Sequence, residues 1–317
     1  MLRRIADHLF WMARYLERAE WRARLADVNY HLLVETPTKD PHPWAPLLAI
    51  TGDGELFAKY YDAPSETDVL DFFTLQTRNP SSIVSCVNAA RENARSLRHR
   101  LSSELWLEIN TLYLDAQQWM PAVFDQQGVY AFFNELRNRF HRLSGISHAT
   151  MPRDVEFDFM TLGTMLERAE NVSRMLDSKY HYLLPRLEDV GGPIDRMQWA
   201  AVLRSASALE AYRRVYGNQI AVARVVEFLL FDEAFPRSAR FAVDRLQAAV
   251  ERIEHTAHSG EPAVFAADSP GGKLAFLLRE GNAEAVIAAG LHEFLMEVQD
   301  LCADIGSVIF DKYLRFE

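Results

Sequence analysis

Five ionisable residues recur at helical spacing near the N-terminus, and their types are those that bind ions or move protons. They are Glu17, Glu20, Arg24, Asp27 and His31. On a helix that turns 100° per residue, these side chains lie within an arc of about 80°. Apolar residues flank the arc on both sides, so we expect this polar stripe to be at least partly buried. Charges buried in this way must be paired or used in a function.

The same stripe recurs 150 residues later, as Glu167, Glu170, Arg174, Asp177 and His181. Between residues 16 and 33, ten of the eighteen positions are identical at this offset. Further matches follow at an offset of 155, where Trp44, Leu48 and Tyr61 align with Trp199, Leu203 and Tyr216. We interpret the chain as two tandem helical repeats, 1–150 and 151–317, that form one compact unit. A pseudo-two-fold relation between them would make the two stripes face each other across a polar cleft.

Three kinds of site are compatible with these stripes. The first is a buried ion-pair network, because Glu20–Arg24 and Glu170–Arg174 have the i,i+4 spacing of a helical ion pair. The second is a pocket for a small charged or peptide-like ligand, in which the two arginines bind carboxylate or phosphate.

The third is a metal centre, since carboxylates and histidines on facing helices build di-iron and di-manganese sites. Its candidate ligands are Asp27, His31, Asp177 and His181. The Glu-x-x-His signature of such sites is absent, and an arginine in the middle of each stripe repels a cation.

A second polar cluster contains Arg91 and Arg95, which share one face of a predicted helix beside Glu92 and Asn93. This face is either solvated and paired with acidic side chains, or it contacts an anion or an acidic partner. No phosphate-binding loop, dinucleotide fingerprint, nucleophile elbow or zinc-protease motif is present. The residue pattern therefore assigns no catalytic residue and no cofactor.

Helical periodicity dominates the elements that must position these residues, and no alternating strand pattern is visible. The pattern predicts an all-α multi-helix bundle. The predicted helices cover 3–34, 44–61, 66–76, 80–101, 103–126, 129–144, 154–184, 195–216, 219–232, 236–257, 270–280 and 282–313.

Composition narrows the function classes. The 317 residues are 49% apolar and 25% charged, as in a globular protein with a sizeable core. The net charge of −10 argues against nucleic acid and against an anionic membrane surface as partners. No signal peptide and no run of ~18 apolar residues is visible, and the two cysteines form no CxxC pair. We therefore expect a cytoplasmic protein.

The repeated LERAE segment and several further blocks resemble the Alpha-E family, named for its helical character and its Glu-Arg motif. The motif maps onto Glu17-Arg18 and Glu167-Arg168. The further blocks are 79–83 (NPSSI), 90–95 (ARENAR), 235–238 (FPRS), and Glu104 with Trp106 and Asn110. The resemblance covers almost the whole chain. One departure is Arg78, where the family pattern has an aspartate.

This resemblance implies a functional context. Alpha-E proteins are encoded beside, or fused to, circularly permuted ATP-grasp ligases, which form amide or peptide bonds. It therefore predicts an accessory or partner protein of an ATP-grasp amide or peptide ligase that modifies a small peptide, with the peptide or ligase held in the polar cleft. The alternative is a helical-bundle enzyme that uses the paired carboxylates and histidines, with or without a metal.

Overall fold

The computed structural model describes residues 3–35, 41–182, 192–257 and 263–315. Within these ranges every regular element is a helix and no strand is present, so the predicted all-α class is confirmed. The chain divides into two compact units, Met1–Thr164 and Met165–Glu317. The boundary falls inside helix α9 (Val155–Tyr182). This division by contacts differs from a division by sequence repeat, and the predicted repeat boundary at 150/151 stays a prediction.

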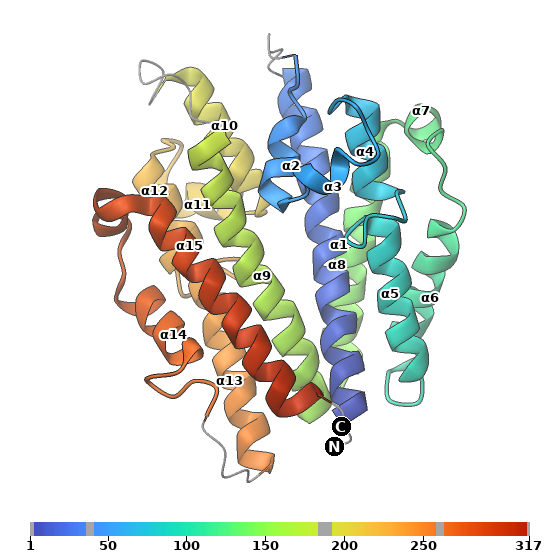
Figure 1. The fold of residues 1–317 in the computed structure, drawn as a ribbon, viewed down its shortest axis with the longest axis vertical. Helices are drawn as coiled ribbons and strands as arrows, with labels where there is room; N and C mark the ends of the chain where they lie inside the picture. Colours follow the sequence, from blue (N-terminus) through green and yellow to red (C-terminus); the bar gives the residue numbers. More distant parts are fainter. Residues whose placement is uncertain (1–2, 36–40, 183–191, 258–262, 316–317) are drawn as a thin grey trace. The chain divides into compact units, whose positions relative to one another are not determined.

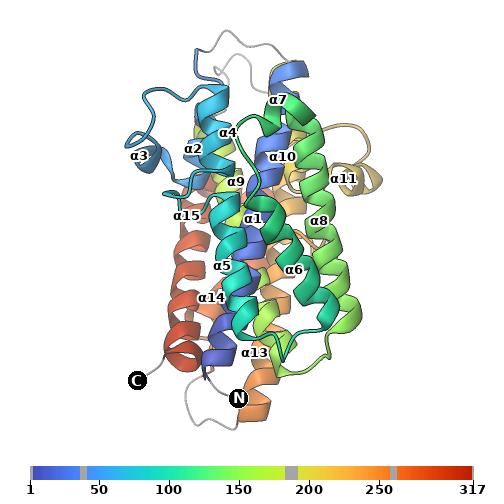
Figure 2. The same ribbon diagram turned by 90° about the vertical axis from the view of Figure 1, so that its right-hand side faces the viewer.

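The first unit is organised around four long helices, α1 (Arg3–Glu35), α5 (Ile83–Ser96), α6 (Ser103–Ala116) and α8 (Val129–Thr150). Helix α1 packs most extensively against α5 and next against α8, while α6 contacts both α5 and α8 (Figure 2). Four short helices complete the unit: α2 (Ala45–Thr51), α3 (Gly54–Phe57), α4 (Glu66–Thr74) and α7 (Val123–Gln127). Helix α1 thus has long neighbours on two sides.

Local capping chemistry explains where the central helices begin. The hydroxyl of Ser82 accepts from the backbone N–H of Ser85 at 3.2 Å, and Ser102 accepts from that of Leu105 at 3.2 Å. The buried Asn79 donates its side-chain amide to the carbonyl of Phe72 at 3.0 Å. The Asn-Pro segment therefore forms the turn that leads into α5, and Ser82 caps the helix.

Three of the predicted helices are each interrupted by a break. Gly52 adopts a left-handed φ of 70° and separates α2 from α3. Ser207, with φ of 52°, lies between α10 (Pro193–Ser205) and α11 (Leu209–Tyr216). A turn that contains Pro121 separates α6 from α7. In the opposite direction, α8 continues through Gly145 to Thr150, beyond its predicted end at 144.

The second unit continues from α9 through α10, α11 and α12 (Val222–Val226), and a π-helical turn, η2 (Glu227–Phe231), follows α12. Its remaining helices are α13 (Ala239–Ala257), α14 (Pro270–Glu280) and α15 (Ala283–Ile309), which ends in the π-helical turn η3 (Phe310–Leu314). Helix α14 packs against both α13 and α15, and Figure 1 shows α15 running along α9. Gly290, with φ of 126°, bends α15 near its start.

Segments that align between the two halves of the sequence pack their aromatic rings alike. The rings of Tyr61 and Phe72 lie 6.0 Å apart at 89°. The rings of Tyr216 and Phe228, which align with Tyr61 and Phe72 at offsets of 155 and 156, lie 6.1 Å apart, also at 89°. The aligned residues Trp44 and Trp199 are both buried. The aligned segments therefore share local packing.

The described helices include none that combines the length and the apolar character needed to cross a membrane.

The first turns of α9 approach α1 closely, and this approach depends on Gly163. A Cβ atom at position 163 would overlap the carbonyl oxygen of Phe10 and lie 3.2 Å from the Cβ atom of Ala13. Since the obstacle is backbone, a side chain there forces the helices apart.

We therefore expect Gly163→Ala to destabilise the first unit by about 1–3 kcal/mol, measured as a lower midpoint of urea or thermal unfolding. Gly145→Ala is the matched control, because Gly145 is also helical and a Cβ there meets no atom within 4 Å. The control should be neutral or stabilising by up to ~1 kcal/mol. Equal midpoints for the two variants would contradict the close approach.

Candidate functional site

The polar stripe of α1 meets α8 within the first unit and forms one group of charged side chains. We call this group the α1–α8 charged cluster; it consists of Glu20, Arg24, Asp27 and His31 from α1, with Arg137 and His141 from α8. The cluster brings together four of the five residues predicted for the first stripe. The fifth, Glu17, lies one turn before Glu20 and is buried.

The base of the cluster is buried to an extent that is unusual for charged residues. Glu20 is 6% exposed, Arg24 1% and Asp27 2%. The apolar shoulders of α1 explain this burial, since Ala19, Ala23 and Ala26 are fully covered. Side chains between such shoulders are buried with them, and their charges require partners inside the protein.

Arg24 and Glu20 form the pair that the i,i+4 spacing predicts. Arg24 Nη2 donates to Glu20 Oε1, and the same nitrogen lies 3.3 Å from His141 Nε2. The His141 Nε2 atom is 3.8 Å from Glu20 Oε1. His141 therefore lies against both members of a buried ion pair and adds a group that can gain or lose a proton near neutral pH.

Asp27 has a different surrounding. Its Oδ2 atom lies 3.1 Å from Arg137 Nη1, and His31 Nε2 is 3.7 Å from its Oδ1. The buried Oδ1 atom has no hydrogen-bond partner among the described residues. Burial raises the pKa of Asp27 above its ordinary value, and the charges of Arg137, His31 and Arg24 partly offset this effect. This carboxylate has unused capacity to accept a hydrogen bond.

The two histidines connect the buried base to solvent. The side chain of His31 is 37% exposed and that of His141 is 58% exposed. The ring of His31 packs edge-on against that of Tyr130 at 4.9 Å. Carboxylates, arginines and accessible imidazoles in one group can bind a charged or amide-bearing ligand, and they can also transfer protons.

The stripe of the second unit is paired in a different way. Arg174 donates to Glu170 Oε1 from Nη2 at 2.8 Å and from Nε at 3.2 Å, but both side chains are partly exposed. Asp177 Oδ1 lies 2.6 Å from Nδ1 of His292 on α15. Glu167 is buried. The side chain of His181 lies outside the described residues.

Arg91 and Arg95 lie in a polar and aromatic network on α5 and α6, remote in sequence from the stripes. Glu92 accepts from Arg91 Nη1 at 2.5 Å and from Arg95 Nη2 at 2.6 Å. Arg91 also donates to Asn110 at 3.2 Å and lies 4.8 Å from the ring centre of Tyr113. The two arginines lower the pKa of Glu92 through hydrogen bonds and charge. Both arginines are thus paired with an acidic side chain, and a contact of this face with an anion or an acidic partner stays a prediction.

Sequence reasoning missed the partners that pair with each stripe. Arg137 and His141 are spaced i,i+4 on α8, as Asp27 and His31 are on α1, so the sequence shows that they share a helix face but not that this face packs on the stripe. It also missed Lys179, a fully buried lysine whose Nζ lies 2.9 Å from Asp195 Oδ1 and 2.7 Å from Gln198 Oε1. Burial lowers the pKa of Lys179, and Asp195 partly offsets this effect.

The metal hypothesis finds no prepared ligand set in the described part of the chain. No three His, Cys, Asp or Glu side chains there are grouped closely enough to hold a metal ion. Asp27 and His31 contribute two such groups. The other side chain at the Asp27 carboxylate is Arg137, whose positive charge opposes the binding of a metal ion. A metal site that includes His181 stays a prediction.

The structure thus defines an all-α protein whose two longest helices, α1 and α9, each contain a Glu-Arg ion pair, buried in α1 and partly exposed in α9. Residues 1–314 match the model of the Alpha-E family, described as a predicted alpha-helical domain with a conserved ER motif. The chain belongs to this family. The arginines of the two adjacent Glu-Arg pairs, Glu17-Arg18 and Glu167-Arg168, make different contacts. Arg168 donates to the carbonyl of Pro236 at 3.0 Å, and Arg18 lies 5.9 Å from the ring centre of Tyr15.

Curated relatives come from mycobacteria and are all described as uncharacterized proteins. One from Mycobacterium bovis and two from strains of Mycobacterium tuberculosis are each 26% identical over 278 residues, or 82% of this chain. The matched part is 31% of each relative, so the chain spans about a third of their length. No solved structure matches the chain.

Replacing Arg137 tests how much the cluster contributes to the free energy of unfolding. Arg137→Met leaves the Asp27 carboxylate buried without its strongest cation, and we expect a loss of about 2 kcal/mol at pH 7. The value lies below that of a fully buried pair because a quarter of the Arg137 side chain is exposed. The raised pKa of Asp27 should rise further, so the loss should shrink as the pH falls and the carboxyl takes up a proton.

The measurement is the unfolding midpoint of wild type and variant between pH 4.5 and pH 7. Arg95→Met is the control, since this exposed arginine forms a surface pair whose loss should change stability by less than ~1 kcal/mol at either pH. A loss that is constant with pH would argue against a coupling of Arg137 to Asp27.

Proposed function

We propose that the chain is an accessory subunit of an ATP-grasp amide or peptide ligase, and that it holds the peptide or the ligase through the α1–α8 charged cluster. The observation that carries this proposal is the buried Asp27 Oδ1 atom, which has no hydrogen-bond partner among the described residues and lies beside the partly exposed His31. Buried acceptor atoms normally have a hydrogen-bond partner, so an acceptor without one in the protein favours a ligand that donates a hydrogen bond to it.

The chemistry of the cluster suits a ligand that carries amide or ammonium groups. Arg24 pairs with Glu20, and Arg137 pairs with Asp27. A carboxylate therefore already offsets the charge of each arginine, which makes the cluster less suited to a large anion. The histidines and the open carboxylate oxygen instead provide mixed donors and acceptors. Peptide bonds and amino termini present the complementary groups.

The length of the relatives supports a function within a larger assembly. This chain corresponds to about a third of those proteins, and the other two thirds leave room for a domain that acts beside it. The identity of that partner as an ATP-grasp ligase comes from the family resemblance. We infer in addition that no nucleic acid takes part, because the net charge is −10.

We further infer that residues 151–317 are a duplicate of residues 1–150 and bring a second polar stripe to the same function. The supporting observations are the ten sequence identities between residues 16–33 and 166–183 and the matched Tyr–Phe ring pairs. Glu170, Arg174, Asp177 and His181 are then the counterparts of the first stripe. That the two stripes line one cleft stays a prediction.

Binding to a circularly permuted ATP-grasp ligase, the class of partner that the family resemblance implies, tests the proposal. We expect a complex with Kd in the micromolar range or tighter, measured by co-purification and calorimetry. The double variant His31→Ala/His141→Ala should weaken the complex about tenfold, because both imidazoles are exposed groups of the cluster. His99→Ala is the control, because His99 is an exposed histidine in the turn after α5. Absence of any association at micromolar concentration would overturn the proposal.

The alternative function, an enzyme in its own right, is supported by two carboxylate–imidazole contacts. Asp177 and His292 are 2.6 Å apart, and Asp27, whose pKa is raised, has His31 as a neighbour. Such pairs perform general acid–base chemistry. Elemental analysis of the purified protein tests the metal-dependent form, which predicts about one equivalent of iron, manganese or zinc per chain. A metal content below ~0.1 equivalent would contradict that form.

A further inference from the structure

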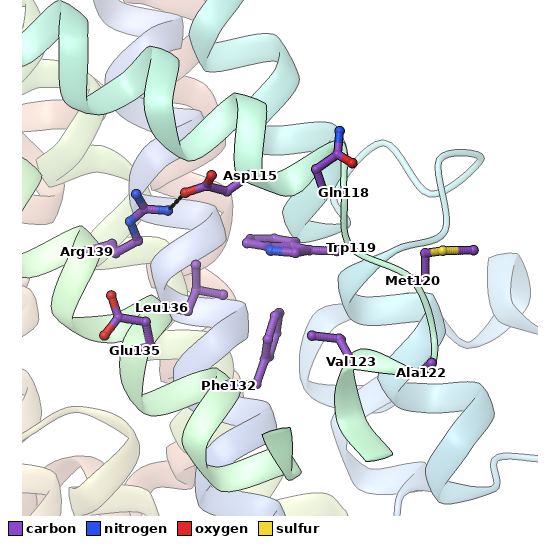
Figure 3. Close-up of a pocket in the computed structure, with 10 residues that line it drawn as sticks. All are labelled: Asp115, Gln118, Trp119, Met120, Ala122, Val123, Phe132, Glu135, Leu136 and Arg139. Carbon is purple, nitrogen blue, oxygen red and sulfur yellow. Dashed lines mark hydrogen bonds and ion pairs between the residues drawn. The ribbon is translucent and has the colours of Figure 1, made fainter. Parts of the chain in front are cut away.

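The first unit contains a pocket that is separate from the α1–α8 charged cluster. Its volume is about 520 Å³, and it lies where the end of α6 and the start of α7 meet α8 (Figure 3). Its lining residues include Asp115, Trp119, Phe132, Glu135, Leu136 and Arg139. None of them belongs to the cluster, and none was singled out by the sequence. A volume of this size accommodates a small organic molecule or two to three amino-acid residues.

The inner wall of the pocket is apolar. Phe132 and Leu136 of α8 are buried, and the Trp119 ring stands edge-on to that of Phe132, with centres 5.1 Å apart at 80°. Figure 3 shows Trp119, Phe132, Leu136 and Val123 pointing into the same hollow. The wall therefore offers an aromatic and aliphatic surface to the body of a ligand.

The rim of the pocket is acidic. Among the described residues that line it, Arg139 is the one cation, and its Nη1 atom donates to Asp115 Oδ2. The Nε atom of Arg139 also lies 3.7 Å from Glu108 Oε1, so its charge is already shared between two carboxylates. The side chains of Asp115 and Glu135 are at least half exposed, and Arg142 approaches Glu135 only to 3.9 Å. This balance favours a cation over an anion at the rim.

We propose that this pocket binds an organic cation with an apolar body: an ammonium group at Asp115 and Glu135, and the body against Trp119, Phe132 and Leu136. An aromatic ring beside carboxylates is the arrangement that recognises ammonium groups, since the ring face and the carboxylates both attract positive charge. Two sources present this chemistry, a small arylalkyl amine and a peptide that begins with a hydrophobic residue. The proposal stands independently of the ligase partnership.

Three probes with the same phenylethyl body isolate the role of the charge. Phenethylamine is a cation at pH 7, N-acetylphenethylamine is neutral, and 3-phenylpropionate is an anion. In ligand-observed NMR titrations of the full chain, we expect saturable binding of phenethylamine with a Kd of about 1 mM or tighter. The neutral probe should bind at least about fivefold more weakly, and the anion should not bind measurably at ~10 mM.

Variants assign the binding to this pocket. Trp119→Leu should weaken phenethylamine binding about fivefold, whereas Trp119→Phe, which keeps an aromatic ring, should retain most of it. Asp115→Asn/Glu135→Gln should make the cation and the neutral probe bind equally. Glu104→Gln is the control, because Glu104 is an exposed carboxylate at the other end of α6. Circular dichroism and unfolding midpoints establish that each variant is folded.

Specific binding results would contradict the proposal or its assignment to this pocket. Equal affinities of wild type for the cation and the neutral probe, or no saturable binding of phenethylamine at ~10 mM, would overturn the proposal. Unchanged binding by Trp119→Leu would overturn the assignment to this pocket. The tripeptide amide Phe-Ala-Ala shows which kind of ligand the pocket prefers. Tighter binding than that of phenethylamine supports a peptide amino terminus, and weaker binding supports a small amine.

Discussion

The ion pair between Asp27 and Arg137 joins the two helices on which the candidate site depends. Asp27 lies on a stripe of α1 whose neighbours are fully covered alanines, so the carboxylate is withdrawn from water. Removing a carboxylate from water costs several kcal/mol unless a cation and hydrogen bonds replace its hydration. Helix α8 supplies that cation at 3.1 Å and places His141 against the neighbouring Glu20–Arg24 pair. The register of α8 along α1 is therefore tied to the chemistry of the site.

The stripes of the two units differ in the residue that pairs with their aspartate and in how far they are covered. In the first unit the cation at the aspartate is an arginine, and the base of the cluster is almost fully covered. In the second unit Asp177 pairs with a histidine, and the Glu170–Arg174 pair is partly exposed. Similar sequences thus pair the aspartate with an arginine of α8 in one unit and with a histidine of α15 in the other.

The features that were predictable from the sequence are those carried by a single helix. The periodicity of residues 3–34, the i,i+4 pair of Arg24 with Glu20 and the burial of a stripe between apolar shoulders are all local properties. Partners on other helices were not predictable: Arg137, His141 and His292 reach the stripes only after long-range packing. Trp119 lies between two helices that appeared continuous in the sequence, because Pro121 alone did not reveal where the break would be. The pocket beside it could not be derived from periodicity.

The most direct test of the account is the coupling free energy between Asp27 and Arg137. It is obtained from a double-mutant cycle with Asp27→Asn, Arg137→Met and the double variant, by chemical unfolding at pH 7. The account predicts a favourable coupling of about 1–3 kcal/mol, since each single change leaves its partner without its counter-charge. A coupling within ~0.3 kcal/mol of zero would contradict the claim that this pair joins α1 to α8.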